Sequence, residues 1–128
     1  MWNINLTKAD KRHCRELIHI GLERECKKFV KDMQSLTYDP ITLAENQPYR
    51  EENGRAVEGP WHKRYIEIFK AVDSFDNYIA DRYDGMTGSH YIDGVICLYC
   101  DGIITDEEIA VLSDEPREFI IRFKNTMR

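Results

Sequence analysis

Residues 89–108, SHYIDGVICLYCDGIITDEE, contain the densest group of apolar side chains in the chain and its one closely spaced cysteine pair. Within this stretch, Tyr91–Cys100 is apolar on most sides, and Asp93 is its only charged residue. A helix that is hydrophobic nearly all round belongs in the middle of a bundle, so we predict a buried central helix here. The alternative is a β-hairpin that turns at Asp101-Gly102. Its second arm would contain only residues 103–105, which disfavours it.

Two further helices are expected after this central helix. Thr105 and Glu108 have the spacing of a capping box, in which the two side chains satisfy backbone donors of a helix's first turn. The short helix that follows directs Ile109 and Leu112 inward. Ser113 is then the expected N-cap of a last helix. The inward face of that last helix consists of Phe119, Ile120 and Phe123.

Two long amphipathic helices are expected before the central one. The first covers residues 7–36, with Thr7 as its N-cap and Asp10 in a capping-box position. The second covers Pro60–Tyr83, with proline in its first turn and Gly85 as a left-handed residue after its end. The apolar stripe of the first helix comprises Cys14, Leu17, Ile18, Gly21, Leu22, Cys26, Phe29, Met33 and Leu36. The stripe of the second comprises Trp61, Tyr65, Ile68, Phe69, Val72, Phe75, Ile79 and Tyr83.

Residues 37–59 separate the two long helices and hold two prolines and an Asn-Gly turn signal, with almost no apolar periodicity. We predict a long connection here, with at most one short helical turn near Leu43. Structureless connections longer than about 15 residues are uncommon in compact domains and are often functional. A chain of 128 residues suits one domain with one core. The sequence therefore predicts an all-α single-domain bundle of four to five helices, in which the two long helices enclose the buried central one.

Two acidic side chains fall close to the apolar stripes. Glu25 lies inside the stripe of the first long helix, and Asp76 lies at the edge of the second. A carboxylate in such a position must be paired, hydrogen-bonded or protonated, so we expect Glu25 to form a salt bridge with an arginine of another helix. The alternative is a ligand-binding or enzymatic site where Glu25 and Asp76 meet the loop that carries Asp84, Ser89 and His90. Metal binding there is disfavoured because the second helix lacks the Glu-x-x-His pattern of helical di-metal sites.

The loop between the second and third helices, DGMTGS at residues 84–89, contains two glycines before a helix start. Such a loop can bind an anion through backbone N–H groups. Its spacing differs, however, from the phosphate-binding patterns GxxxxGK[ST] and GxGxxG. We therefore expect Gly85 to end one helix and Ser89 to cap the next.

Cys97 and Cys100 form a Cys-x-x-Cys motif at the predicted C-terminus of the central helix. Thioredoxin-type motifs owe their low thiol pKa to a helix N-terminus, whereas a C-terminus and the neighbouring Asp101 both raise the pKa. A four-cysteine zinc site is also disfavoured, because Cys14 and Cys26 are separated by about 18 Å of helix. We expect small, buried, reduced thiols and neither a resident metal nor a cofactor.

The segment CLYCDGIITDEE, residues 97–108, resembles the second half of an EF-hand loop, with Gly102 as the turn glycine and Glu108 as the bidentate glutamate. In that register the first and third positions are a cysteine and a tyrosine, which offer no carboxylate. The remaining ligands are Asp101, the Ile103 carbonyl and Glu108. These are too few for the roughly six to eight oxygens that calcium takes.

The same DGxIT-x-x-E pattern is similar to the helix–loop–helix link of tellurite-resistance TerB-like domains. The run FDNYIADRYDGMTGSHY, residues 75–91, followed by DGIITDEEI, resembles small all-α domains of uncharacterised bacterial proteins. These resemblances imply a helical fold and bring no activity with them.

Composition and charge narrow the classes of function. No run approaches the roughly 18 apolar residues of a membrane span, and the N-terminus lacks the pattern of a secretory signal, so we expect a cytoplasmic protein without membrane contact. The net charge of −5 argues against nucleic acid as a partner. The charge is uneven: residues 1–36 carry eight basic and five acidic side chains, net +3, and residues 37–128 carry net −8.

The four histidines are scattered, and no complete catalytic or metal-binding set is present, so an enzyme is disfavoured. We expect a protein–protein interaction or regulatory module, with a protein partner or self-association as a homodimer. The predicted contact surface is the basic beginning of the first helix, where basic side chains lie on or beside the apolar stripe. This surface comprises Lys8, Lys11, Arg12 and Arg15.

Overall fold

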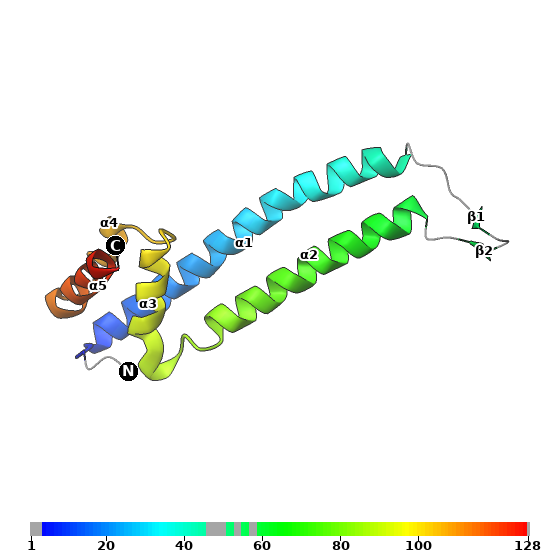
Figure 1. Cartoon of the computed structure of the whole chain (residues 1–128). Helices are drawn as coiled ribbons and strands as arrows, with labels where there is room; N and C mark the ends of the chain where they lie inside the picture. Colours follow the sequence, from blue (N-terminus) through cyan, green and yellow to red (C-terminus); the bar gives the residue numbers. More distant parts are fainter. Residues whose placement is uncertain (1–3, 46–50, 53–54, 57–58, 128) are drawn as a thin grey trace. The chain divides into compact units, whose positions relative to one another are not determined.

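The computed structural model of the chain describes residues 4–45, 51–52, 55–56 and 59–127. The elements, in chain order, are α1 (Lys8–Glu45), the short strands β1 (Glu51–Glu52) and β2 (Arg55–Ala56), α2 (Pro60–Tyr83), the 3-10 turn η1 (Gly88–His90), α3 (Tyr91–Cys100), α4 (Asp106–Ile109) and α5 (Asp114–Thr126) (Figure 1). The two strands pair antiparallel, with Glu51 opposite Ala56 and Glu52 opposite Arg55. The prediction of an all-α architecture with four to five helices is confirmed.

The chain divides into two compact units. The core unit comprises residues 1–26 and 79–128, and the second unit comprises Lys27–Tyr78. Every buried hydrophobic side chain among the described residues belongs to the core unit, so this unit holds the hydrophobic core. These side chains are Cys14, Leu17, Met86, Ile92, Val95, Ile96, Leu98, Tyr99, Ile104, Ile109, Leu112 and Ile120.

Helix α1 begins where the sequence predicted and continues to Glu45. The prediction of a loop from residue 37 is therefore wrong for residues 37–45. The sequence favoured a break because Pro40 lacks a backbone donor, but one missing hydrogen bond does not end a helix whose neighbouring residues keep theirs. The rest of the predicted connection contains β1 and β2. Residues 46–50, 53–54 (the Asn-Gly dipeptide) and 57–58 lie outside the described residues.

Helix α3 is the buried central helix that the sequence predicted, and the alternative of a β-hairpin is wrong. Six of its ten residues are buried, and it packs against α5 (Figure 1). Two glycines allow α3 to approach its other neighbours, α1 and Met86, closely. A Cβ added at Gly21 of α1 would lie 2.7 Å from Leu98 Cδ1, and one added at Gly94 would lie 2.9 Å from Met86 Sδ.

The turn after α3 is defined by local signals. Gly102 has a φ of 77°, a left-handed conformation that glycine adopts at little cost. Its N–H donates to the Tyr99 carbonyl at 3.1 Å, and the Ile103 N–H donates to the Leu98 carbonyl at 2.9 Å. This pair of bonds is the Schellman motif of a helix C-terminus. The predicted capping box of α4 is also present, since Thr105 and Glu108 accept from each other's backbone N–H.

Helix α2 differs most from expectation. Only Ile79–Tyr83 belong to the core unit, and the whole helix has no buried residue. Within the second unit the ring of Phe75 stacks on that of Phe29 of α1, with centroids 4.1 Å apart. This contact covers one edge of the predicted stripe, where Ile68 and Phe75 are half-buried. The side chains on the other edge are exposed, so the described residues cover only part of the predicted stripe.

Candidate functional site

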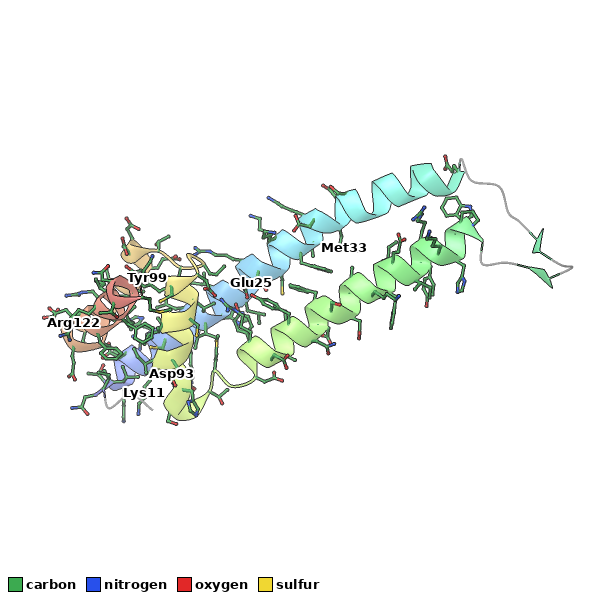
Figure 2. All side chains as sticks on the ribbon, viewed as in Figure 1. Lys11, Glu25, Met33, Asp93, Tyr99 and Arg122 are labelled. Atoms are coloured by element: carbon green, nitrogen blue, oxygen red, sulfur yellow. The ribbon has the colours of Figure 1, made fainter. Side chains whose placement is uncertain are left out.

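Glu25 is the centre of an ion-pair network in the core unit (labelled in Figure 2). Its side chain is only 10% exposed and lies 3.1 Å from Arg82 Nε, and Tyr83 donates a hydrogen bond of 2.6 Å to its Oε2. The other side of Arg82 pairs with Asp101 Oδ2 at 2.7 Å. Burial, and then the hydrogen bond to Glu25, raise the pKa of Tyr83 well above its usual range, so this donor keeps its proton.

The predicted salt bridge of Glu25 with an arginine of another helix is therefore confirmed. Arg82 contacts the carboxylates of Glu25 and Asp101, and Tyr83 donates a further hydrogen bond to Glu25. The negative charge of Glu25 is therefore compensated inside the fold. A general base or a metal ligand needs a carboxylate that can be approached. The arrangement around Glu25 favours a structural role for this residue.

Asp10 is a second buried acid, and the sequence reasoning assigned it only to a helix cap. It is 2% exposed and accepts the expected capping bond from the Thr7 N–H at 3.1 Å. It also accepts hydrogen bonds from the N–H of Ser113 at 2.8 Å and from the Ser113 hydroxyl at 2.6 Å. Burial alone raises the pKa of Asp10, but the bonds from Ser113 and Thr7 outweigh it and leave the pKa below its ordinary value.

The contact between Asp10 and Ser113 joins the first turn of α1 to the residue just before α5. Ser113 stands at the N-cap position of α5, as predicted, but its side chain makes no cap bond and donates to Asp10 instead. A signal for it was present in the sequence. Asp10 precedes Cys14 by four residues and Leu17 by seven, so it lies on the apolar stripe of the helix, as Glu25 does.

Arg24 of α1 lies beside the EF-hand-like turn and contacts the same oxygen atoms that would bind calcium in an EF-hand. Its guanidinium makes two bonds to the Glu108 carboxylate, at 2.6 and 2.7 Å, and donates to the Ile103 carbonyl at 2.8 Å. The hydrogen bond from Arg24, against a smaller effect of burial, lowers the pKa of Glu108 to about 2.

The three oxygen ligands of the EF-hand-like segment are thus already bound to arginines. Glu108 and the Ile103 carbonyl contact Arg24, and Asp101 contacts Arg82. A guanidinium supplies the positive charge that calcium would supply in an EF-hand. The resemblance in sequence therefore reflects the turn and its cap, which a helix–loop–helix needs whatever it binds.

A hollow of about 530 Å³ opens beside α3 in the core unit. Its lining combines both cysteines of the Cys-x-x-Cys motif with charged and apolar side chains. The lining residues are Arg82, Asp93, Ile96, Cys97, Cys100, Asp101, Phe123 and Met127. None of the five predicted binding residues, Glu25, Asp76, Asp84, Ser89 and His90, lines this hollow.

None of the four cysteines, all of which lie in the described part of the chain, is paired in a disulfide, and not all of them are buried. Cys14 is fully buried, and burial, followed by the charge of Asp10, raises the pKa of its thiol to about 12. Cys97 is exposed, and Cys26 and Cys100 are half-buried. Burial and then Asp101 raise the pKa of Cys100, which agrees with the argument against a thioredoxin-type thiol. The prediction of buried thiols is wrong for Cys97, because its side of α3 faces the hollow.

The loop before α3 is built differently from expectation. The left-handed glycine is Gly88, with a φ of 57°, and not Gly85. Ser89 lies within η1, and α3 begins after His90, whose side chain makes no cap bond. Ser89, His90 and Asp84 are all exposed. His90 Nδ1 lies 3.1 Å from Asp93 Oδ2 (Asp93 is labelled in Figure 2).

Four apolar side chains on the outer edge of α2 form an exposed stripe in the second unit. They are Trp61, Tyr65, Phe69 and Val72, which are 53%, 61%, 56% and 45% exposed. Their spacings of four, four and three residues place them on one face of the helix. We call this surface the α2 stripe. Asp76, the remaining candidate residue, lies one turn beyond its end and is exposed.

The predicted basic surface of α1 is also exposed at each of its four positions. Lys8, Lys11, Arg12 and Arg15 all face solvent in the core unit (Lys11 is labelled in Figure 2). Arg12 pairs loosely with Glu16 at 4.0 Å. Exposed pairs of this kind contribute little to stability.

Comparison with known proteins adds no relative: no family model, no curated protein and no solved structure matches the chain. Within the described residues, no helix combines the length and apolarity needed to cross a bilayer. The functional argument therefore rests on the surfaces and clusters described above.

Proposed function

We propose that the chain is a non-enzymatic protein–protein interaction module that self-associates through the α2 stripe. The observation that carries this proposal is the 45–61% exposure of four large apolar side chains on one helix face. A contiguous apolar patch of a few hundred Å² has the size of the largest patch on a typical monomer, and such a patch is often a functional surface. Aromatic residues are also enriched where protein surfaces meet, because they bury a large area at a small entropic cost.

The arrangement of the α2 stripe allows a second copy of the chain as the partner. Two copies of α2 that pair antiparallel about the middle of the stripe bring Trp61 of each helix opposite Val72 of the other, and Tyr65 opposite Phe69. A two-fold symmetric contact uses the same patch twice, which is the commonest arrangement of homodimers.

The apolar area of the α2 stripe indicates how tightly two copies of the chain can associate. Aromatic side chains bury about 150–250 Å² each when fully covered, and these are about half exposed. The four therefore offer roughly 400 Å² in each copy, or about 800 Å² in total, below the roughly 1,200 Å² of stable specific interfaces. The proposed dimer is thus weak and depends on concentration, unless further residues of the chain contribute.

Sedimentation velocity from about 1 µM to about 1 mM protein tests the proposal, over the range where weak interfaces dissociate. The wild type is expected to pass from monomer to dimer in this range. Phe69→Glu places a charge in the middle of the stripe and is expected to remain monomeric. Ser74→Glu, an exposed position on the opposite side of α2, is the matched control and is expected to associate like the wild type. Circular dichroism checks that both variants keep their helix content.

Two outcomes contradict the proposal. The first is a wild type that stays monomeric at the highest concentration. The second is a Phe69→Glu variant that associates as strongly as the wild type. If Lys11→Glu with Arg15→Glu abolishes association and Phe69→Glu does not, the contact surface is the basic face of α1, and the α2 stripe is excluded.

The alternative of a ligand-binding or enzymatic domain at Glu25, Asp76 and the 84–90 loop has less support. Glu25 is bound by Arg82 and Tyr83, and the loop residues Asp84, Ser89 and His90 are exposed. A set of side chains that converge on one protected point is the usual mark of a catalytic site. The interaction module is therefore the better supported function.

A further inference from the structure

The hollow beside α3 brings together three sulfur atoms that the sequence does not place near one another. Cys97 and Cys100 are three residues apart on α3, so their side chains project from one face of the helix. Met127 follows α5, and its Sδ lies 4.0 Å from Cys100 Sγ. All three side chains line the same hollow, so the sulfurs share one solvent-accessible space.

We propose that Cys97, Cys100 and Met127 form a binding site for a soft monovalent metal cation, copper(I) in the first place. Thiolate and thioether sulfur are the donors that copper(I) prefers over harder metals. The binding is a simple exchange, in which the two thiols each release a proton, the thioether stays neutral and the copper keeps its oxidation state.

The observed sulfur distance fits this coordination. A metal bound equally to three sulfurs at about 2.3 Å, the usual length of a metal–thiolate bond, places the sulfurs about 4.0 Å apart. The separation between Cys100 and Met127 already has this value. Cys97, exposed on the same hollow and one helical turn before Cys100, supplies the third sulfur.

The bound site carries one net negative charge, because two thiolates surround one copper(I) ion. Two cationic side chains lie near it: Arg82 lines the hollow, and the charge of Lys124 acts on Cys100. The carboxylates of Asp93 and Asp101 line the same hollow and oppose this charge.

Zinc and harder metals fit this site less well. Structural zinc takes four ligands in a tetrahedron, usually cysteine and histidine. Among the described residues, histidine, cysteine, aspartate and glutamate side chains form no group of three or more that could hold a metal ion. The thioether is therefore the required third donor, and only soft cations bind thioethers well.

A competition titration tests the site. The reduced full-length protein is mixed under anaerobic conditions with copper(I) held by bicinchoninate, and loss of the coloured complex reports transfer to the protein. We expect one copper per chain, with roughly a 100-fold or greater loss of affinity in Cys97→Ser, more than outer-shell changes normally cause. Met127→Leu, which keeps shape but removes the donor, is expected to show a clear but smaller loss. Zinc in the same protein is expected to bind more weakly.

Cys26→Ser is the matched control, because Cys26 is a half-buried thiol outside the hollow. It is expected to bind copper like the wild type. The proposal is overturned if the wild type takes no copper from bicinchoninate, if Cys26→Ser lowers affinity as much as Cys97→Ser, or if Met127→Leu has no effect. Since Cys97 and Met127 are both exposed, circular dichroism is expected to show native helix content in both variants. The α2 stripe plays no part in this test.

Discussion

Replacing Glu108 by glutamine removes the charge that Arg24 binds on the first turn of α4. The structure sets the size of the effect. The pKa of Glu108 falls from 4.5 to about 2, and a shift of one unit corresponds to about 1.4 kcal/mol, which gives an upper limit of roughly 3.4 kcal/mol. Since the Arg24 side chain is 44% exposed, solvent screening reduces this contribution, and we expect Glu108→Gln to lose about 1–2 kcal/mol.

The pH dependence gives the same prediction a second measurement. A carboxylate whose pKa is lowered by folding stabilises the fold above its unfolded pKa, here 4.5, and this stability is lost as the pH falls toward about 2. Urea unfolding of the wild type between pH 7 and pH 2.5, followed by circular dichroism, is expected to show that loss. In Glu108→Gln the loss between pH 4.5 and 2.5 is expected to be smaller by the same 1–2 kcal/mol. Hydrogen exchange of the α3 amides reports on the core unit alone.

Glu107→Gln is the matched control. Glu107 precedes Glu108 on α4 and is exposed, so its replacement alters the same first turn without removing the pair with Arg24. It is expected to change stability by less than about 0.5 kcal/mol, as surface substitutions usually do. Equal losses in the two variants, or an unchanged pH profile in Glu108→Gln, would refute the assignment of this stability to the Arg24 pair.

Three further predictions concern the core unit. Asp10→Ala leaves buried donors without an acceptor, and it is expected to lower the free energy of unfolding in urea by roughly 3 kcal/mol at pH 7. The loss is expected to be smaller below the ordinary aspartate pKa of about 3.9. An equal loss at both pH values contradicts this. Gly21→Ala meets a packed leucine at 2.7 Å and is expected to lower the melting temperature, whereas Gly85→Ala, which meets nothing within 4 Å, is expected to leave it unchanged or raise it. Cys97 is expected to react with Ellman's reagent in the native protein, while Cys14 reacts only on unfolding; protection of Cys97 would contradict its exposure.

Local signals in the sequence predicted much of the fold. The capping box at Thr105, the turn at Gly102 and the apolar character of α3 each depend on neighbouring residues, and each has the expected structure. The need of Glu25 for a positive partner also followed from its place on the helix, and the structure supplies Arg82. Such features can be predicted because a few adjacent residues determine them.

The features that the sequence did not predict depend on residues far apart in the chain. Periodicity shows that α2 has an apolar face, but it does not show how much of that face a neighbouring helix covers. It also does not indicate that a buried Asp10 bonds to Ser113, or that Met127 reaches Cys100. A single helix wheel carries no information about the partner helix. For the same reason, the sequence did not predict which side chains line the hollow beside α3.

The bond between Asp10 and Ser113 has a consequence for how the protein is made. The two residues are separated by 103 positions, and a ribosome adds about 5–20 residues per second. Asp10 is therefore synthesised roughly 5–20 s before Ser113. For most of that time, until α3 is synthesised, the apolar face of α1 has no partner to cover it. Nascent chains are thus expected to expose this face to chaperones until α3 has formed.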